Sequence, residues 1–319
     1  MASTLNELAK VTVTPLGKAV IEDLLRQSKV LQLAPIESIN GLRVNHARWQ
    51  TLPSIATRAV NGTYTESTGQ LDQVQETLHI YGGEVKVDRV LEGDKTAIES
   101  PMTTQTKMKV AALAYKVNQD FIKGDHAVDP NGFEGLTKRV SNLPTRMTID
   151  LASSGDSLKV LASATTENSF LDGVHELIHK SMANVLFMNE GTYLGFGKVL
   201  RRLALSATTK DAYDRIWDVF AGTKLVDIGL QSDQSTEIIT ATEDPGDAGN
   251  DATSIYGVRF DGEDGLRIIQ LAGFGPEPVD FGELQTQPQK MKRIDWPIGL
   301  QVVGKFAVGR LKGFKMAAA

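Results

Sequence analysis

The sequence contains one motif that is typical of a metal centre, His175-Glu176-Leu177-Ile178-His179. On a helix, residues i and i+4 share a face, so His175 and His179 could bind one zinc ion while Glu176 acts as the general base of a metallopeptidase. No glycine and third histidine follow downstream, and all other histidines lie in the first half of the chain. The alternative is a solvated helix face whose spacing is coincidental. We favour this second interpretation, which leaves the protein without a metal site or cofactor.

The composition excludes several other kinds of site. The 319 residues include no cysteine, which rules out disulfides, thiolate catalysis and cysteine-based zinc or iron–sulfur centres. There is no phosphate-binding glycine loop and no nucleophile elbow. The acidic loop 244–251 has oxygen ligands for calcium but lacks the spacing of an EF-hand, so a flexible turn is the better interpretation. The histidine motif is therefore the sharpest candidate for chemistry in this sequence.

Nothing in the sequence indicates a membrane or a secretory route. No apolar run approaches the roughly 20 residues that span a bilayer. The first residues lack the basic start and apolar core of a signal peptide. Hydrophobic residues make up 41% and charged residues 23% of the chain, which is close to the globular average. We expect a soluble protein with no membrane partner.

Hydrophobic periodicity predicts the main helices and strands. Helices are expected over 15–33, 100–124, 166–182 and 191–205. Strands are expected over 42–49, 76–91, 185–188, 225–230, 255–260, 266–271, 287–295 and 300–311. The strands 255–260 and 266–271 are predicted to form a hairpin, and the pair Gly82-Gly83 predicts a bulge or bend.

A long polar segment, 53–74, separates the first two predicted strands. It is rich in Thr, Ser, Gly, Asn and Gln and poor in large apolar residues. A structureless loop of this length is uncommon inside a compact domain. Because it has too little apolar surface to fold back on its own core, we expect its ordering energy to come from another chain. This segment therefore indicates an assembly protein and not a self-contained enzyme.

The order of the predicted elements, over nearly the whole chain, resembles that of tailed-bacteriophage major capsid proteins with the Hong Kong 97-like fold, an α+β fold. Several local phrases carry the resemblance: Phe121-Ile122-Lys123-Gly124-Asp125 and the following Pro130–Leu136, Val185–Glu190, Phe220–Asp227, Ile294–Leu300 and Arg310–Gly313. One phrase departs from the family, because Thr223-Lys224 stands where Val-Pro is more usual.

The resemblance implies a division of the chain. Residues 1–41 would be an N-terminal arm, 42–91 an extended β-hairpin loop, 92–145 a peripheral domain with a spine helix, 146–285 an axial domain and 286–319 the return strands of the peripheral domain. The implied function is a head shell subunit. It would self-assemble into hexamers and pentamers of an icosahedral virion capsid that encloses double-stranded DNA, formed in the host cytoplasm. Portal, scaffold or decoration proteins are possible partners.

Two departures bear on how such subunits would be held together. The extended loop has no lysine between Leu42 and Val85, and no asparagine follows Asn250, so a Lys–Asn crosslink like that of the family's type member is not expected. Only about forty residues precede the first strand, so a scaffold would come from a separate chain or be absent. The expected grip is therefore noncovalent, and its candidate contact residues are Arg58, Tyr64, Glu66 and Asp72.

Charge is distributed unevenly along the second half of the chain. Residues 226–285 contain thirteen acidic against two basic residues, and residues 286–319 contain seven basic against one acidic. From charge alone, two solvated surfaces are the simpler interpretation. With the resemblance, we expect an inward, DNA-facing basic surface that includes Lys290, Lys292, Arg293 and Lys312. An encapsulin-like nanocompartment shell is the alternative function on the same fold, and a zinc metallopeptidase is the remote one.

Overall fold

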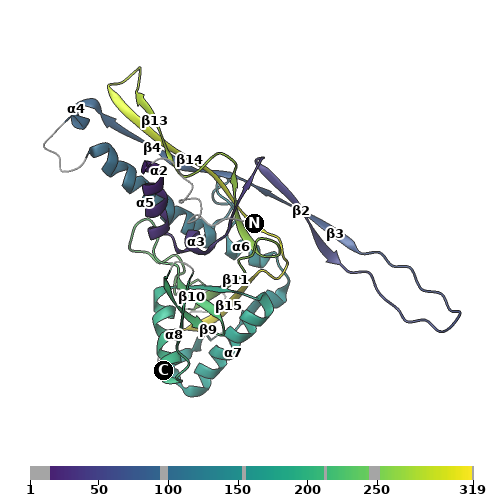
Figure 1. Cartoon of the computed structure of the whole chain (residues 1–319). Helices are drawn as coiled ribbons and strands as arrows, with labels where there is room; N and C mark the ends of the chain where they lie inside the picture. Colours follow the sequence, from purple (N-terminus) through teal and green to yellow (C-terminus); the bar gives the residue numbers. More distant parts are fainter. Residues whose placement is uncertain (1–14, 94–99, 153–155, 212–213, 244–251, 318–319) are drawn as a thin grey trace.

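The computed structural model describes residues 15–93, 100–152, 156–211, 214–243 and 252–317. These residues form sheets of five, eight and two strands together with several helices. Figure 1 shows two units, one at each end of the molecule. One is a long sheet with a helix that runs along it, and the other is a compact unit of helices and a second sheet. A two-stranded ribbon projects sideways between them. No helix in these ranges is long and apolar enough to cross a membrane. The acidic loop 244–251 lies outside the described residues.

The five-stranded sheet is built around β14 (Gln289–Val302). Along one edge, β14 pairs antiparallel with β4 (His79–Asp88). Along the other edge it pairs first with β13 (Pro278–Glu283) and then with β12 (Leu266–Leu271), which also pairs with β1 (Ile36–Ile39). The helix α5 (Pro101–Lys123) packs against β4, and the short α4 (Arg89–Glu92) follows β4.

The sequence predicted two strands, over 287–295 and 300–311. In the structure, β14 runs without a break from the first into the start of the second, and the end of the second belongs to another strand, β15 (Val308–Lys315). Pro297 lies between the stretches that pair with β13 and with β12, so β14 has a partner on one edge only at this position. A proline, which has no N–H, is tolerated where one edge of a strand is unpaired. The strand therefore continues through the proline that appeared to end it.

The predicted bulge at Gly82-Gly83 is wrong, because the β4–β14 register continues through both residues. The structure gives the first glycine a different role. A Cβ atom at Gly82 would overlap the carbonyl oxygen of Ile294 in β14. A Cβ atom at Gly83 would meet only the flexible side chain of Lys109, whose nearest atom is 3.1 Å away. Close approach of two strands, and not a bend, explains the glycine at position 82.

This geometry predicts unequal effects of two neighbouring substitutions. Gly82→Ala should lower the free energy of unfolding by roughly 1–3 kcal/mol, because backbone atoms cannot move aside as a side chain can. Gly83→Ala is the matched control and should change it by less than about 0.5 kcal/mol. Urea unfolding of both variants measures the difference. Equal losses would show that the close contact with Ile294 is unimportant.

The eight-stranded sheet forms the second unit. Its strand order is β5 (Thr148–Asp150), β15 (Val308–Lys315), β11 (Thr253–Val258), β7 (Val185–Met188), β10 (Thr223–Asp227), β9 (Ile216–Phe220) and β8 (Ala207–Lys210), and β6 (Leu158–Lys159) also pairs with β15. The helices α7 (Ala164–Ser181) and α8 (Glu190–Arg202) enclose a core with this sheet that includes Phe170, Phe196 and Phe314. The connections include α6 (Leu136–Ser141), η1 (Thr145–Met147) and η2 (Val160–Ala162).

The predicted hairpin of strands 255–260 and 266–271 is wrong. The strand β11 pairs with β15 and β7 in the eight-stranded sheet, whereas β12 pairs with β1 and β14 in the five-stranded sheet. Both strands are extensively buried, so each needs partners along both edges, which a two-stranded hairpin cannot supply. The expected domain boundary at residue 286 does not coincide with the division between the two sheets. The strands β12 and β13, which precede it, join β14 in the five-stranded sheet, whereas β15, which follows it, joins β11 in the eight-stranded sheet.

The N-terminal helices belong to the core. The predicted helix 15–33 is divided at Ser28 into α2 (Pro15–Gln27) and α3 (Lys29–Leu33). The Ser28 hydroxyl accepts a hydrogen bond from the Leu31 backbone N–H and donates one to Asn118 Oδ1 in α5. From Val20 onward both helices contribute buried side chains, so the described part of the expected N-terminal arm is packed into the body. Residues 1–14 lie outside the described residues.

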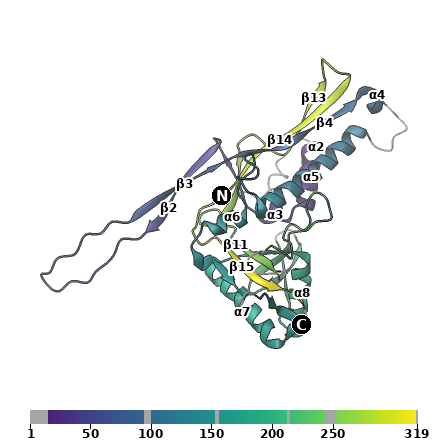
Figure 2. The same cartoon turned by 180° about the vertical axis from the view of Figure 1, so that it is seen from behind.

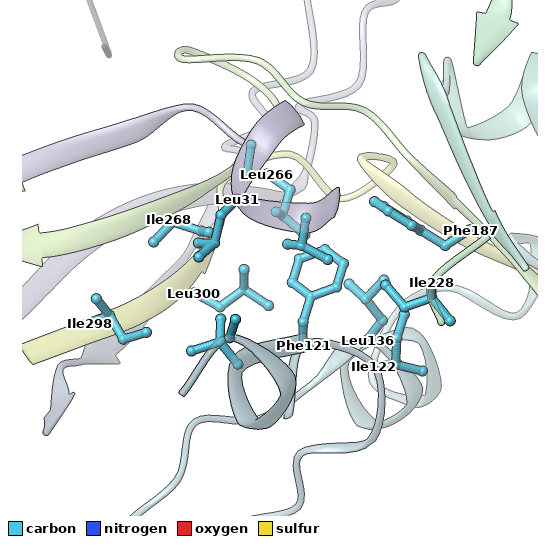
Figure 3. Close-up of a cluster of buried hydrophobic side chains, with 14 of the residues drawn as sticks. Leu31, Phe121, Ile122, Leu136, Phe187, Ile228, Leu266, Ile268, Ile298 and Leu300 are labelled. Atoms are coloured by element: carbon cyan, nitrogen blue, oxygen red, sulfur yellow. The ribbon is translucent and has the colours of Figure 1, made fainter. Parts of the chain in front are cut away.

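One hydrophobic cluster joins the two larger sheets. Figure 3 shows Phe121 of α5 between Leu300 and Leu266 of the five-stranded sheet on one side and Phe187 of the eight-stranded sheet on the other, below Leu31 of α3. The ring centroids of Phe121 and Phe187 are 5.4 Å apart. Buried side chains from both sheets therefore pack in one hydrophobic core. We call these two packed units the body of the molecule, from which the ribbon projects.

Candidate assembly interface

The projecting ribbon consists of β2 (Arg43–Thr51), β3 (Gln70–Thr77) and the connection 52–69. We call residues 43–77 the arm and residues 52–69 its tip; Figure 2 shows both from behind. The arm differs from the expected loop 42–91, because β4 belongs to the five-stranded sheet. The predicted polar segment 53–74 is also shorter than expected, since β3 already begins at Gln70.

The arm is almost entirely outside the body. Every residue from 51 to 73 is exposed. Large apolar side chains lie along it, with Ile55 97% and Val60 92% exposed, and the others are Trp49, Leu52, Tyr64 and Leu71. Trp49 and Leu71 are cross-strand partners and therefore share one face of the ribbon. On an otherwise polar arm, these are the side chains that a covering molecule would remove from water.

The four candidate contact residues are all exposed on the arm. At the tip, the Arg58 guanidinium lies over the ring of Tyr64, 5.2 Å from its centroid, and donates a hydrogen bond to the Gly62 carbonyl oxygen. Glu66 lies further along the tip. Asp72 is on β3, opposite Arg48 of β2. The structure thus brings Arg58 and Tyr64 together and places Asp72 on the paired part of the arm.

A buried ion pair fixes the root of the arm. The Arg139 guanidinium on α6 donates to both carboxylate oxygens of Glu76 on β3, at 2.5 and 2.8 Å. It also donates to the carbonyl oxygens of Leu300 in β14 and of Glu134, both at 2.8 Å. The two side chains are only 13% and 10% exposed. One guanidinium therefore joins the arm, the five-stranded sheet and α6.

A second set of contacts joins β2 to the end of β14. The His46 ring bonds through Nε2 to the Val302 carbonyl oxygen at 3.1 Å and through Nδ1 to the Gln301 side chain at 3.2 Å. Arg48 donates to the same Val302 carbonyl oxygen at 2.8 Å. Lys305 donates to the Gln50 carbonyl oxygen at 3.0 Å. The arm is therefore held at its root by side chains on both of its strands.

The electrostatic environment of this root favours uncharged histidine. Burial, followed by the nearby Arg48 cation, lowers the pKa of His46. Burial also lowers the pKa of Arg48. Close by in β4, burial and then His126 lower the pKa of His79, whose ring centroid lies 5.5 Å from that of His126.

The sequence interpretation did not identify these root residues. Val44, His46 and Arg48 are half-buried and alternate with exposed residues along β2. Two polar side chains at inward-facing positions of a strand are a signal that could have been noticed. Their partners Arg139 and Gln301 carried no such signal, because they are distant in sequence and come close only in the folded chain.

The His175-Glu176-x-x-His179 motif lies on α7, as predicted, with both histidines exposed. The Glu176 carboxylate is paired with Lys180 at 2.5 Å, and the His175 ring packs edge-on against Phe220, 4.8 Å between centroids. Within the described ranges, no group of three or more His, Asp and Glu side chains could hold a metal ion. The geometry offers the two histidines no third ligand there.

The four expected inward basic residues are divided between the two larger sheets. Lys290, Lys292 and Arg293 lie on β14, whereas Lys312 lies on β15. Three of them have acidic neighbours: Lys292 is 3.7 Å from Asp280, Arg293 is 2.6 Å from Asp295, and Lys312 is 3.0 Å from Asp150. The excess of positive charge in this part of the sequence is thus partly balanced by Asp280 and Asp150, which come from other segments.

Comparisons with known proteins agree with this architecture. Residues 15–163 match the family described as major capsid protein GP7. The SrpI encapsulin from Synechococcus elongatus PCC 7942 has a similar structure, with a TM-score of 0.63 and 11% identity over 90% of this chain and 87% of that one. The capsid of a native GTA particle has a TM-score of 0.58 and 16% identity, over 92% of this chain and 90% of that one. The structure from Mycobacterium phage Ogopogo has a TM-score of 0.57 and 10% identity, over 90% of this chain and 92% of that one.

No curated protein matches the chain in sequence. At 10–16% identity the structural likenesses show a shared fold, and this confirms the α+β Hong Kong 97-like architecture that the sequence predicted. The family match adds a region of sequence that covers α2, the arm and α5. The chain therefore has the Hong Kong 97-like fold, and just under half of it matches the model of the major capsid protein GP7 family.

Proposed function

We propose that the chain is the head shell subunit of a tailed bacteriophage and assembles into hexamers and pentamers of an icosahedral shell. The observation that carries this proposal is the arm, whose apolar side chains lie exposed along residues 49–71 with no cover from the body. A single chain gains nothing from such an arm, whereas a neighbouring copy that covers it removes this apolar surface from water. We assign Arg58, Tyr64, Glu66 and Asp72 to this contact.

The grip of each arm is noncovalent in this proposal. Interfaces that hold stably usually bury on the order of 1,200–2,000 Å² in total. An arm that overlaps a neighbour adds contact area beyond a flat contact between bodies. Each subunit in a closed ring both gives an arm and receives one, so many weak contacts act together. This accounts for a stable shell without the lysine that a Lys–Asn crosslink needs.

The shell encloses double-stranded DNA through non-specific contacts, to which we assign Lys290, Lys292, Arg293 and Lys312. Salt-dependent attraction to phosphates needs no base-reading side chains. Assembly takes place in the host cytoplasm, with portal, scaffold or decoration proteins as partners. The chain acts mechanically, as a structural protein, and not as an enzyme. We assign the five-stranded sheet with α5 to the peripheral domain of this scheme, and the eight-stranded sheet with α7 and α8 to its axial domain.

Electron microscopy of the purified protein, together with a measurement of its nucleic-acid content, tests the function. We expect closed shells built of pentamers and hexamers, which package DNA when the phage's other head proteins are present. Small shells that carry protein cargo and no DNA would instead assign the chain to an encapsulin-like compartment. A protein that stays monomeric under all assembly conditions would contradict both functions.

A further inference from the structure

The hydrogen bonds around Gln301 fix the orientation of its side-chain amide. Gln301 is completely buried. Its Oε1 accepts a hydrogen bond from Arg267 Nε at 2.8 Å, and Arg267 is itself held by the Gly262 carbonyl oxygen and by the carboxylate of Glu37. An arginine can only donate, so the amide oxygen must face it and the amide N–H₂ must face the opposite way. That opposite direction leads to His46 Nδ1.

This orientation determines the protonation state of His46. Since Gln301 presents a donor, Nδ1 must accept, and therefore carries no proton. Since the Val302 carbonyl oxygen accepts, Nε2 must donate. The contacts of His46 are thus complete only for the neutral ring with its proton on Nε2. A second proton, on Nδ1, would point at the N–H₂ group of Gln301. The Gln301 amide cannot rotate to present its oxygen instead without breaking its hydrogen bond with Arg267.

The charged groups around His46 add to this effect. Arg48 lies beside it on β2, Arg267 faces it from β12, and both oppose a positive charge on the ring. Glu76 on β3 favours such a charge, but its two oxygens are already engaged by Arg139 of α6, and Glu37 of β1 is engaged by Arg267. Protonated His46 would therefore add a further cation beside Arg48 and Arg267 without gaining a free carboxylate.

We propose that His46 is a positioning residue for the arm, and that its neutral Nε2–H form, fixed by Gln301, Arg267 and Val302, holds the arm in the orientation seen here and releases it on acidification. The release involves one chain only; its use in changing how arms grip their neighbours rests on the proposed function. Histidine is the side chain whose charge changes in the physiological range, so the device would respond to mild acid.

The direction of the pH dependence follows from the linkage of protonation to docking. The pKa of His46 in the docked arm is lowered from its ordinary value of 6.5, whereas in a released arm it returns towards that value. The undocked state therefore binds the proton more tightly. Docking is fully favourable above pH 6.5, and this contribution is lost as the pH falls through the lowered pKa.

A distance measurement on the unassembled full-length chain tests the proposal. Because the chain has no cysteine, Gln73→Cys on β3 and Asn168→Cys on α7 provide two unique positions for spin labels; both residues are exposed. Labelled chain is diluted with unlabelled chain, and the distance between the two spin labels is measured by double electron–electron resonance between pH 8 and pH 5. We expect a narrow distance distribution at pH 8 that broadens with a midpoint below pH 6.5.

Three variants separate His46 from other titrating groups. His46→Gln keeps a donor for Val302 but cannot titrate, and should show the same distribution at pH 8 and pH 5. Gln301→Glu offers Nδ1–H an acceptor and should keep the arm docked at pH 5. His179→Gln, an exposed histidine on α7, is the matched control and should broaden like the parent chain. A parent chain whose distances do not change with pH, or a His46→Gln chain that still broadens, would overturn the proposal. None of these measurements requires shell assembly, so the result of the test is independent of the proposed function.

Discussion

Replacing the tip of the arm with a two-residue turn should abolish shell closure and leave a folded, soluble subunit. Thr51 and Gln70 are cross-strand partners, so Asn-Gly in place of residues 52–69 should close the β2–β3 hairpin. The tip has no buried residue, and shortening a surface loop has a small effect on stability. We expect the unfolding midpoint to stay near that of the parent chain, while particles disappear in sedimentation and electron microscopy.

A full-length control distinguishes the apolar contacts of the tip from its length. Ile55→Ser, Val60→Ser and Tyr64→Ser, combined in one chain, keep every backbone atom and remove three large exposed apolar side chains. If neighbouring copies cover these side chains, the triple variant should assemble much less than the parent chain. If it closes shells normally while the shortened chain does not, the tip acts by its backbone or length alone. Normal closure by the shortened chain would remove the arm from the assembly mechanism altogether.

Removal of the Arg139 guanidinium should cause the largest loss of stability of any single change at the arm root. Arg139→Met leaves the Glu76 carboxylate buried without its cation and also leaves the carbonyl oxygens of Leu300 and Glu134 without this donor. Breaking a buried ion pair by removing one partner typically costs 3–5 kcal/mol. We expect the free energy of unfolding to fall by about 3 kcal/mol or more in urea titrations.

A double-mutant cycle tests whether this loss comes from the ion pair. Glu76→Gln combined with Arg139→Met removes both charges, and should be clearly less destabilising than the sum of the two single changes. Lys86→Met is a surface control, because Lys86 pairs with Glu84 at 2.9 Å while about two-fifths of each side chain remains exposed. It should leave the unfolding midpoint unchanged. Additive losses in the cycle would show that Arg139 acts through the Leu300 and Glu134 carbonyl groups and not through Glu76.

Two sets of contacts hold the root of the arm, and they differ in how they respond to acid. The Arg139–Glu76 pair contains no histidine, so protonation of His46 removes none of its hydrogen bonds. The His46 contacts require a neutral ring and fail in mild acid. The proposed release is therefore a release from the orientation seen here: the β2 side of the root loosens while Arg139 still holds β3, and the arm changes direction without detaching.

The local elements could be predicted from the sequence because their signals are local. The helix α5 follows from Ser100-Pro101 at its start, an apolar stripe that includes Val110, Leu113 and Val117, and Gly124 at its end. The strand β7 was read correctly as a short apolar run. The arm was anticipated because a long polar segment between two strands cannot bury itself. Composition excluded the cysteine-based sites, and the order of the elements led to the fold.

Strand partners and the arm root were decided by the tertiary structure alone. The strands β11 and β12 are neighbours in sequence but lie in different sheets, because each is buried along its length and needs partners on both edges. His46 and Gln301 are separated by 255 residues, and Glu76 and Arg139 by 63. Sequence patterns report which side chain prefers burial. Which buried donor meets which acceptor depends on how the whole chain packs, and that determines where the arm points.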